Sequence, residues 1–273
     1  MNAKGVEDPV VSLTVVERVA HVVIERPEKR NAMNRAVLDA LLAAAHELVD
    51  QIASGTVGAV VIAGRGDVFS AGLDLADLAA LTVQRLSEED VADAQAVFTA
   101  FEELDAPTLA AIDGVCLGAG LQLALACHVR GVTDRASLAV LEPRWGLVPD
   151  LGASWRLPRL IGQGRALELM LSTRRVDAGE ARAIGLAEVS LQGDALSAGH
   201  ELAVRWAQGP EVLRYLPRLV RTSTASAPQD AFRDEARLQL QMLAGGDVAE
   251  AVRAAAESRA PRFGQGGSPE RTP

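Results

Sequence analysis

The sequence predicts an α/β fold in which strands and helices alternate through the first half and helices fill the last third. Three observations predict this fold. Short apolar runs of strand length alternate with longer segments of helical periodicity up to about residue 152. From Ala153 onward almost every segment has helical periodicity. Finally, the 273 residues are 49% hydrophobic, which is enough for a substantial core.

The first elements are a hairpin, a helix and a strand. Two β-rich runs, residues 10–16 and 21–25, flank a short polar turn and predict the hairpin. From Asn34 apolar residues recur on one helical face, with Asn34 as the N-cap. A buried strand is expected over residues 58–63.

The next helix is expected over residues 87–104, opened by a capping box of Ser87 and Asp90. Further strands are expected at residues 108–112, 129–133 and 137–141, and further helices at 121–127, 163–171, 178–184, 195–207 and 230–256. We predict a flexible N-terminus over residues 1–9, a core over 10–195, a helical C-terminal region over 196–260 and a disordered tail over 261–273.

Composition narrows the class of ligand. The net charge of −9 and the 3% aromatic content argue against nucleic acid, so a small molecule is the expected ligand. No apolar run is long enough to cross a membrane, and Lys4, Glu7 and Asp8 occupy positions where a signal peptide would be apolar. We therefore expect a cytoplasmic protein. Cys116 and Cys127 lack metal-ligand spacing and are interpreted as buried thiols, so neither a disulfide nor a metal site is expected.

Two turns of small residues follow buried strands and point to one oxygen-binding site. Residues 118–122 (GAGLQ) join a strand to a helix, and residues 69–74 (FSAGLD) follow the strand at 58–63. Backbone N–H groups from both turns can converge on one oxygen. Tight strand-to-helix packing is the alternative explanation. A dinucleotide site is disfavoured because the third glycine of its fingerprint is missing.

Four segments carry a resemblance to a known family: residues 26–33 (RPEKRNAM), 69–74, 113–122 (DGVCLGAGLQ) and 142–152 (EPRWGLVPDLG). In this order and spacing they resemble the enoyl-CoA hydratase/isomerase (crotonase) family, over about residues 10–260. The resemblance implies a crotonase (ClpP-like) spiral of ββα units whose helical C-terminal region forms homotrimers, often paired into hexamers. It also implies an acyl-CoA thioester as ligand, with coenzyme A as part of the substrate and no separate cofactor or metal.

The resemblance implies roles for individual residues. The backbone N–H groups of Ala71 and Ala119 are expected to form an oxyanion hole for the thioester carbonyl, where one donor contributes about 3–4 kcal/mol to catalysis. The turn with Arg26, Lys29 and Arg30 is expected to lie along the CoA phosphates, although solvated surface charge is the alternative. The expected substrate-binding residues are Arg26, Lys29, Ala32, Gly72, Leu73, Asp74, Gly118 and Gln122.

The reaction depends on which carboxylates are present. Hydratases of this family use two glutamates, at the positions of Glu142 and Gln122, and an amide cannot exchange protons. The single Glu142 favours Δ3,Δ2-enoyl-CoA isomerisation in fatty-acid or related acyl-CoA metabolism. Asp150 is a second catalytic candidate, because dienoyl-CoA isomerases have an Asp at this spacing; its alternative role is a helix cap.

Several alternatives stay open. A 2-enoyl-CoA hydratase, a dienoyl-CoA isomerase and a noncatalytic acyl-CoA-binding protein compete with the isomerase. Glu142 turned inward beside the turns favours an enzyme, whereas a surface Glu142 favours the binding protein. Ser70 has no convincing histidine partner, so a serine hydrolase is disfavoured. Leu73, Leu75, Leu78 and Leu81 form an aliphatic stripe that we assign to core packing rather than to an acyl pocket.

Overall fold

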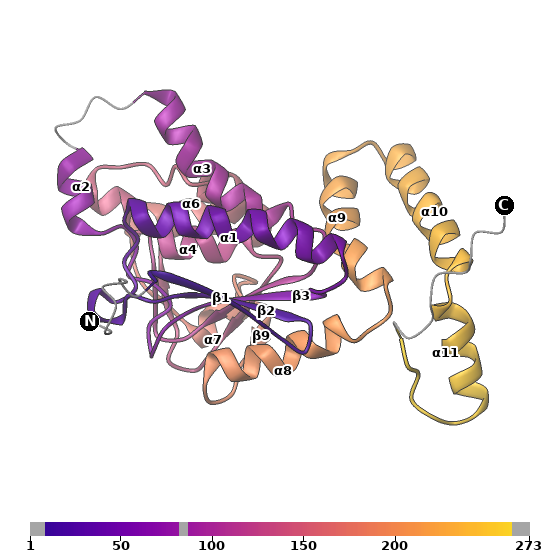
Figure 1. Ribbon diagram of the computed structural model, residues 1–273. Helices are drawn as coiled ribbons and strands as arrows, with labels where there is room; N and C mark the ends of the chain where they lie inside the picture. Colours follow the sequence, from indigo (N-terminus) through magenta and orange to yellow (C-terminus); the bar gives the residue numbers. More distant parts are fainter. Residues whose placement is uncertain (1–8, 82–86, 264–273) are drawn as a thin grey trace, which may run out of the picture.

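A six-stranded sheet forms the centre of the computed structural model, which describes residues 9–81 and 87–263 (Figure 1). The strands lie in the order β1 (Val11–Val16), β2 (Val19–Ile24), β3 (Ala59–Gly64), β4 (Thr108–Ile112), β6 (Val129–Val132) and β9 (Val189–Ser190). From β2 to β9 all neighbours are parallel, and only β1 runs antiparallel to β2. The central strands β3 and β4 are almost fully buried, which explains their continuous apolar sequences.

The predicted hairpin is confirmed. β1 and β2 pair over their full length, from Val16 opposite Val19 to Val11 opposite Ile24. Glu17 and Arg18 form the turn with φ angles of 50° and 65°. Two successive residues with positive φ match the twist of a two-residue hairpin, and here neither of them is glycine.

The chain alternates between the large sheet and a smaller, three-stranded sheet, and so winds as a spiral. The smaller sheet contains β5 (Val115–Leu117), β7 (Ser137–Ala139) and β8 (Val176–Asp177), with β5 and β7 parallel. The chain passes from β4 in the large sheet to β5 in the small one through Gly114 and then enters α4 (Ala119–Ala126). Two strands followed by a helix therefore repeat along the chain, as the resemblance implied.

Helices cover both faces of the large sheet (Figure 1). On one side α1 (Arg35–Ala53) packs against α3 (Glu88–Glu102), and on the other α8 (Ala195–Ala207) packs against β3 and β4. The Asn34 side chain accepts a hydrogen bond from the Val37 N–H, and Ser87 and Asp90 form the predicted capping box. Because α8 packs on the sheet, it lies with the core rather than with the C-terminal helices, where residues 196 onward were expected.

Three helices extend away from this core (Figure 1). They are α9 (Val212–Ala225), α10 (Pro228–Ala244) and α11 (Asp247–Ala256). The single helix expected over residues 230–256 is wrong, because Gly245 and Gly246 separate α10 from α11. Glycine lacks the side-chain contacts and backbone restriction that sustain a helix.

The remaining elements connect the sheets and shape the site. They are the 3₁₀ turns η1 (Pro27–Lys29) and η2 (Glu142–Trp145) and the helices α2 (Leu75–Leu81), α5 (Ala153–Ile161), α6 (Gln163–Ser172) and α7 (Ala178–Ala183). The strand expected to reach residue 141 ends at Ala139, and Glu142 begins η2. Among the described residues no helix combines the length and the apolar character needed to cross a bilayer. Most of the N-terminus predicted to be flexible (residues 1–9) and of the tail predicted to be disordered (residues 261–273) lies outside the described residues, namely residues 1–8 and 264–273.

Candidate active site

A cavity of about 420 Å³ opens where the turn at residues 69–74, the N-terminus of α4 and η2 meet. Ser70 pairs with Cys116 of β5, and Met33 pairs with Leu73, so the two small-residue turns lie side by side. The cavity is lined by Lys29, Arg30, Ala32, Ala71, Gly72, Leu73, Asp74, Leu75, Leu117, Gly118, Ala119, Leu141, Glu142, Trp145 and Leu147. It therefore gathers residues from all four motifs of the sequence.

Glycine lets the two turns approach each other. A Cβ atom on Gly72, where φ is 99°, would lie 2.9 Å from the Leu117 carbonyl oxygen and 3.7 Å from the Ala119 nitrogen. A Cβ on Gly118, where φ is 50°, would lie 3.3 Å from Oε1 of Glu142. Larger residues would separate the turns or displace the carboxylate, so these glycines shape the site itself.

The free backbone donors are not the expected pair. The Ala71 N–H donates to the Arg30 carbonyl at 3.0 Å, so its assignment to the oxyanion hole is wrong. The N–H groups of Leu73 and Ala119 have no acceptor among the described residues. Ala119 is the first residue of α4, where N–H groups lack intrahelical partners. Around Leu73, the pairing with Met33 uses the Gly72 carbonyl and the Asp74 N–H, which leaves the Leu73 N–H unused.

Glu142 is buried at the cavity, with only 7% of its surface exposed. Its Oε1 accepts a hydrogen bond from Nε2 of Gln122 at 2.7 Å, whereas its Oε2 is buried and has no partner among the described residues. Burial raises the pKa of Glu142, the Gln122 hydrogen bond opposes this rise, and the charge of Asp150 adds to it. Of the two arrangements left open by the sequence, Glu142 therefore has the inward one, which favours an enzyme over a binding protein.

Gln122 holds Glu142 and does not line the cavity. The Gln122 side chain is buried, and its Oε1 accepts the Ala153 N–H at 3.0 Å. Because that oxygen must face a donor, the amide nitrogen faces Glu142. Both ends of the amide are therefore occupied, and its expected contact with substrate is replaced by a contact with the acid/base candidate.

Asp150 lies close enough to Glu142 for its charge to act, but it does not cap a helix. Helix α5 begins at Ala153, and its N-cap residue Gly152 provides no side-chain hydrogen bond. The cap interpretation of Asp150 is therefore wrong. Partial burial raises the pKa of Asp150 itself. Its backbone carbonyl accepts a hydrogen bond from Gln95 of α3 at 2.6 Å.

The three basic residues of the turn at residues 26–33 have different surroundings. Arg26 donates to the Ala32 carbonyl at 2.5 Å and forms an ion pair with Asp74 at 3.1 Å, so its guanidinium is committed within the protein. Lys29 and Arg30 line the cavity. Arg26 itself is not among the residues that line the cavity, because its guanidinium is turned to Ala32 and Asp74.

Asn31 organises this turn, and the sequence reasoning missed it. Its side chain is fully buried and bonds to the Arg26 N–H and to the carbonyls of Arg65 and Val68. Its φ angle of 53° follows one of 54° at Arg30, and the position of asparagine after a 3₁₀ turn was the available signal. Ser70 donates to the Asn31 carbonyl at 2.8 Å, so its hydroxyl is part of this scaffold.

The aliphatic stripe lines the cavity in part. Leu73 and Leu75 line it, and Leu75 is 62% exposed, so its assignment to the core is wrong. The side chains of Leu78 and Leu81 lie outside the described residues. Trp145 and Leu147, which the sequence did not single out, complete the apolar wall.

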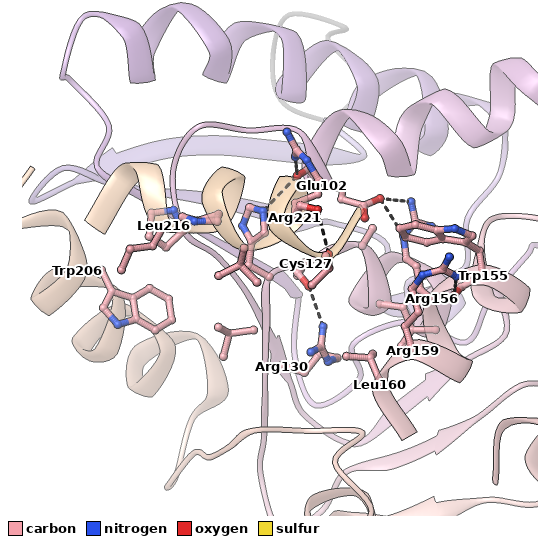
Figure 2. Close-up of a pocket in the computed structure, with 18 of the residues that line it drawn as sticks. Glu102, Cys127, Arg130, Trp155, Arg156, Arg159, Leu160, Trp206, Leu216 and Arg221 are labelled. Atoms are coloured by element: carbon pink, nitrogen blue, oxygen red, sulfur yellow. Dashed lines mark hydrogen bonds and ion pairs between the residues drawn. The ribbon is translucent and has the colours of Figure 1, made fainter. Parts of the chain in front are cut away.

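A second cavity, of about 490 Å³, lies between α5, α9 and the C-terminal end of α4 (Figure 2). His128 lines it, and burial lowers the pKa of this histidine to about 4. Its Nε2 lies 3.1 Å from the Glu102 carbonyl and its Nδ1 accepts the Thr108 N–H. The guanidinium of Arg130 bonds to Glu188 and to the Cys127 carbonyl. These polar groups are therefore engaged within the protein.

The family model described as enoyl-CoA hydratase/isomerase matches residues 14–266. The chain belongs to the enoyl-CoA hydratase/isomerase family. The mitochondrial Δ(3,5)-Δ(2,4)-dienoyl-CoA isomerase of Mus musculus is 33% identical over 263 residues, covering 89% of this chain and 78% of that protein. The resemblance stated from the four motifs is thereby confirmed.

Solved structures of enoyl-CoA hydratase/isomerase family members share the fold. The enoyl-CoA hydratase of Bacillus anthracis superposes with a TM-score of 0.84 at 27% identity, covering 93% of this chain and 98% of that one. A Thermobifida fusca protein assigned as an enoyl-CoA hydratase, solved with acetoacetyl-CoA, gives a TM-score of 0.76 at 32% identity over 86% and 95% of the two chains. The crotonase α/β fold of this chain is therefore confirmed.

Proposed function

We propose that this enzyme converts 3-enoyl-CoA to 2-enoyl-CoA, with Glu142 as its single acid/base. One observation carries the proposal. The same cavity has a carboxylate oxygen without a partner, Oε2 of Glu142, and two backbone N–H groups without an acceptor among the described residues, those of Leu73 and Ala119. Glu142, Leu73 and Ala119 all line that cavity. A noncatalytic binding protein has no need for a buried carboxylate there, since such burial costs stability.

The chemistry follows from these groups. The thioester carbonyl accepts the N–H groups of Leu73 and Ala119, and Glu142 removes a proton from C2. The electron pair of the broken C2–H bond forms a C1–C2 double bond while the carbonyl π pair moves onto oxygen. The resulting dienolate is conjugated with the C3–C4 double bond, and the two donors stabilise its oxygen. Glu142 then returns the proton at C4, leaving the double bond between C2 and C3. A carboxyl whose pKa is raised by burial serves both steps better than an ordinary glutamate.

Gln122 argues against efficient hydration. Hydration needs a water that is held and activated, and the amide of Gln122 is occupied by Ala153 and Glu142. Dienoyl-CoA isomerisation is a second candidate, because the charge of Asp150 acts on Glu142 and the mouse relative carries that name. In that reaction Asp150 acts as a second proton carrier.

Lys29 and Arg30 are the cations proposed to meet the CoA phosphates, and no separate cofactor is needed. We further propose that α9, α10 and α11 mediate a homotrimer or hexamer. Large apolar side chains on these helices are exposed, among them Phe232, Leu240 and Val252. Exposed apolar surface of this kind marks protein contacts. The measured mass of the protein in solution tests the oligomer.

Turnover of 3-enoyl-CoA, 2-enoyl-CoA and 3,5-dienoyl-CoA by the wild type and by Glu142→Gln tests the function. We expect isomerisation of 3-enoyl-CoA by the wild type, its loss in the variant and unchanged binding of a nonreactive acyl-CoA. Faster turnover of either other substrate assigns the enzyme to hydration or to dienoyl-CoA isomerisation instead. Tight binding without any turnover refutes an enzymatic role.

A further inference from the structure

We propose that Gln122 is a positioning residue for Glu142, held in turn by the N-terminus of α5, which the Arg156–Glu102 ion pair anchors. In this arrangement Oε2 of Glu142 is the oxygen that exchanges the proton, because Oε1 is held by the Gln122 amide. The inference deepens the proposed function and rests on Glu142 being its acid/base.

The side-chain amide of Gln122 connects the N-terminus of α5 to Glu142. The Ala153 N–H donates to Gln122 at 3.0 Å, and Gln122 donates to Glu142 at 2.7 Å. Ala153 is the first residue of α5, so its N–H has no helical partner and lies at the positive end of the helix. The donor therefore fixes which way the amide faces, and the amide fixes one oxygen of the carboxylate.

The position of Ala153 is supported in turn by Arg156. Arg156, whose side chain is 9% exposed, donates to the Leu151 carbonyl at 3.0 Å and pairs with Glu102 of α3 at 2.6 Å. Gly152 packs so closely that a Cβ there would lie 1.9 Å from Nη1 of Arg156. The two residues before Ala153 are therefore held against a buried guanidinium.

Figure 2 shows the anchor of this arrangement at the second cavity, where Arg156 and Arg221 both reach the end of α3. Arg221 of α9 donates to the Glu102 carbonyl, and His128 meets the same oxygen. Glu102 thus joins α3, α5 and α9 at one point. A contact chain runs from Arg221 through Glu102, Arg156 and the start of α5 to Gln122 and Glu142.

The test measures the titration of the Glu142 carboxyl itself by infrared spectroscopy. The spectrum of each protein is compared with that of the same protein carrying the additional substitution Glu142→Gln, so that the difference reports Glu142 alone. This signal does not depend on turnover. Other charges facing the cavity are Lys29, Arg30 and Asp74, with Asp150 nearby, and all are retained. In Gln122→Met a side chain of similar length lacks the donor. We expect the Glu142 midpoint to rise by about one pH unit, as the loss of a hydrogen bond to a charged group predicts.

Kinetics provide the second readout. We expect kcat of Gln122→Met to fall about 10- to 100-fold with KM within twofold, and the acid limb of its pH profile to follow the infrared midpoint. Gln192→Met, at an exposed glutamine, is the matched control and leaves both unchanged. An unchanged Glu142 midpoint in Gln122→Met overturns the proposal. If Glu142→Gln itself retains turnover, the proposed function fails while the midpoint shift still stands.

Arg156→Met tests the anchor, with Arg174→Lys at an exposed ion pair as control. We expect Arg156→Met to raise the Glu142 midpoint in the same direction as Gln122→Met, and Arg156→Lys to recover part of the shift. A folded Arg156→Met protein with the wild-type midpoint overturns the part of the proposal that lies beyond Gln122.

Discussion

The two cavities at opposite ends of α4 differ in whether their polar side chains already have hydrogen-bond partners within the protein. The cavity at its N-terminus measures about 420 Å³ and holds Glu142, which has an oxygen without a partner. The cavity at its C-terminus is larger, at about 490 Å³, yet both ring nitrogens of His128 there are engaged. Between these two cavities, a carboxylate oxygen without a partner, and not cavity size, therefore distinguishes the candidate active site.

Removing the acid/base at the first cavity should have the largest effect. Glu142→Gln keeps the shape and the Gln122 contact but cannot carry a proton. We expect kcat for isomerisation to fall on the order of 10³- to 10⁴-fold, because one group performs both transfers. Steady-state kinetics measure this loss, with Glu201→Gln at an exposed position of α8 as the control. A loss of less than tenfold would show that another group carries the proton.

Removing one backbone donor tests the oxyanion hole. Ala119→Pro deletes an N–H at the first position of α4, where proline is tolerated. We expect kcat to fall about 10²- to 10³-fold. Ala195→Pro makes the same change at the first position of α8, away from the cavity, and should leave kcat unchanged. Equal losses in both variants would assign the effect to misfolding.

At the second cavity, titration should affect stability and not chemistry. Burial lowers the pKa of His128 from 6.5 to about 4. As the pH falls, the unfolded chain therefore takes up a proton on this histidine at a higher pH than the folded protein does. The stabilisation is complete above pH 6.5 and is lost as the pH falls toward 4, by about 3 kcal/mol. Denaturant unfolding at several pH values measures this slope. His128→Gln should remove it and His46→Gln, at an exposed site, should not; a retained slope in His128→Gln contradicts the assignment.

Burial of the Glu142 carboxylate in the first cavity should lower the stability of the wild type at neutral pH by a small amount. The pKa of Glu142 is raised by burial, so its contribution to stability is complete below the usual glutamate pKa and is lost as the pH rises through the raised value. We therefore expect Glu142→Gln to increase the free energy of unfolding by about 0.5–2 kcal/mol at pH 7.5. The gain should vanish in acid. A variant less stable than the wild type at pH 7.5 would mean that the charged carboxylate is well satisfied.

Local patterns predicted much of the fold. The hairpin, the Asn34 cap, the Ser87–Asp90 capping box and the strands β3, β4 and β6 of the large sheet are set by neighbouring residues, and each is confirmed. The long helix over residues 230–256 was the main failure, because paired glycines at 245 and 246 end a helix in spite of its apolar periodicity. β8 and β9 were missed because two-residue strands are too short to show alternation.

The order of strands and glycines along the chain was enough to locate the two small-residue turns, because these are local properties, but it left open whether Glu142 faces the turns or the solvent. Folding settles that within the described part of the chain the N–H of Leu73, and not that of Ala71, lacks an acceptor, that Asp74 engages Arg26, and that Gln122 holds Glu142. Each of these outcomes depends on a hydrogen bond between residues 20 to 48 positions apart. A polar group's role is set by the partners that folding brings to it, and such partners leave no periodic signal in the chain.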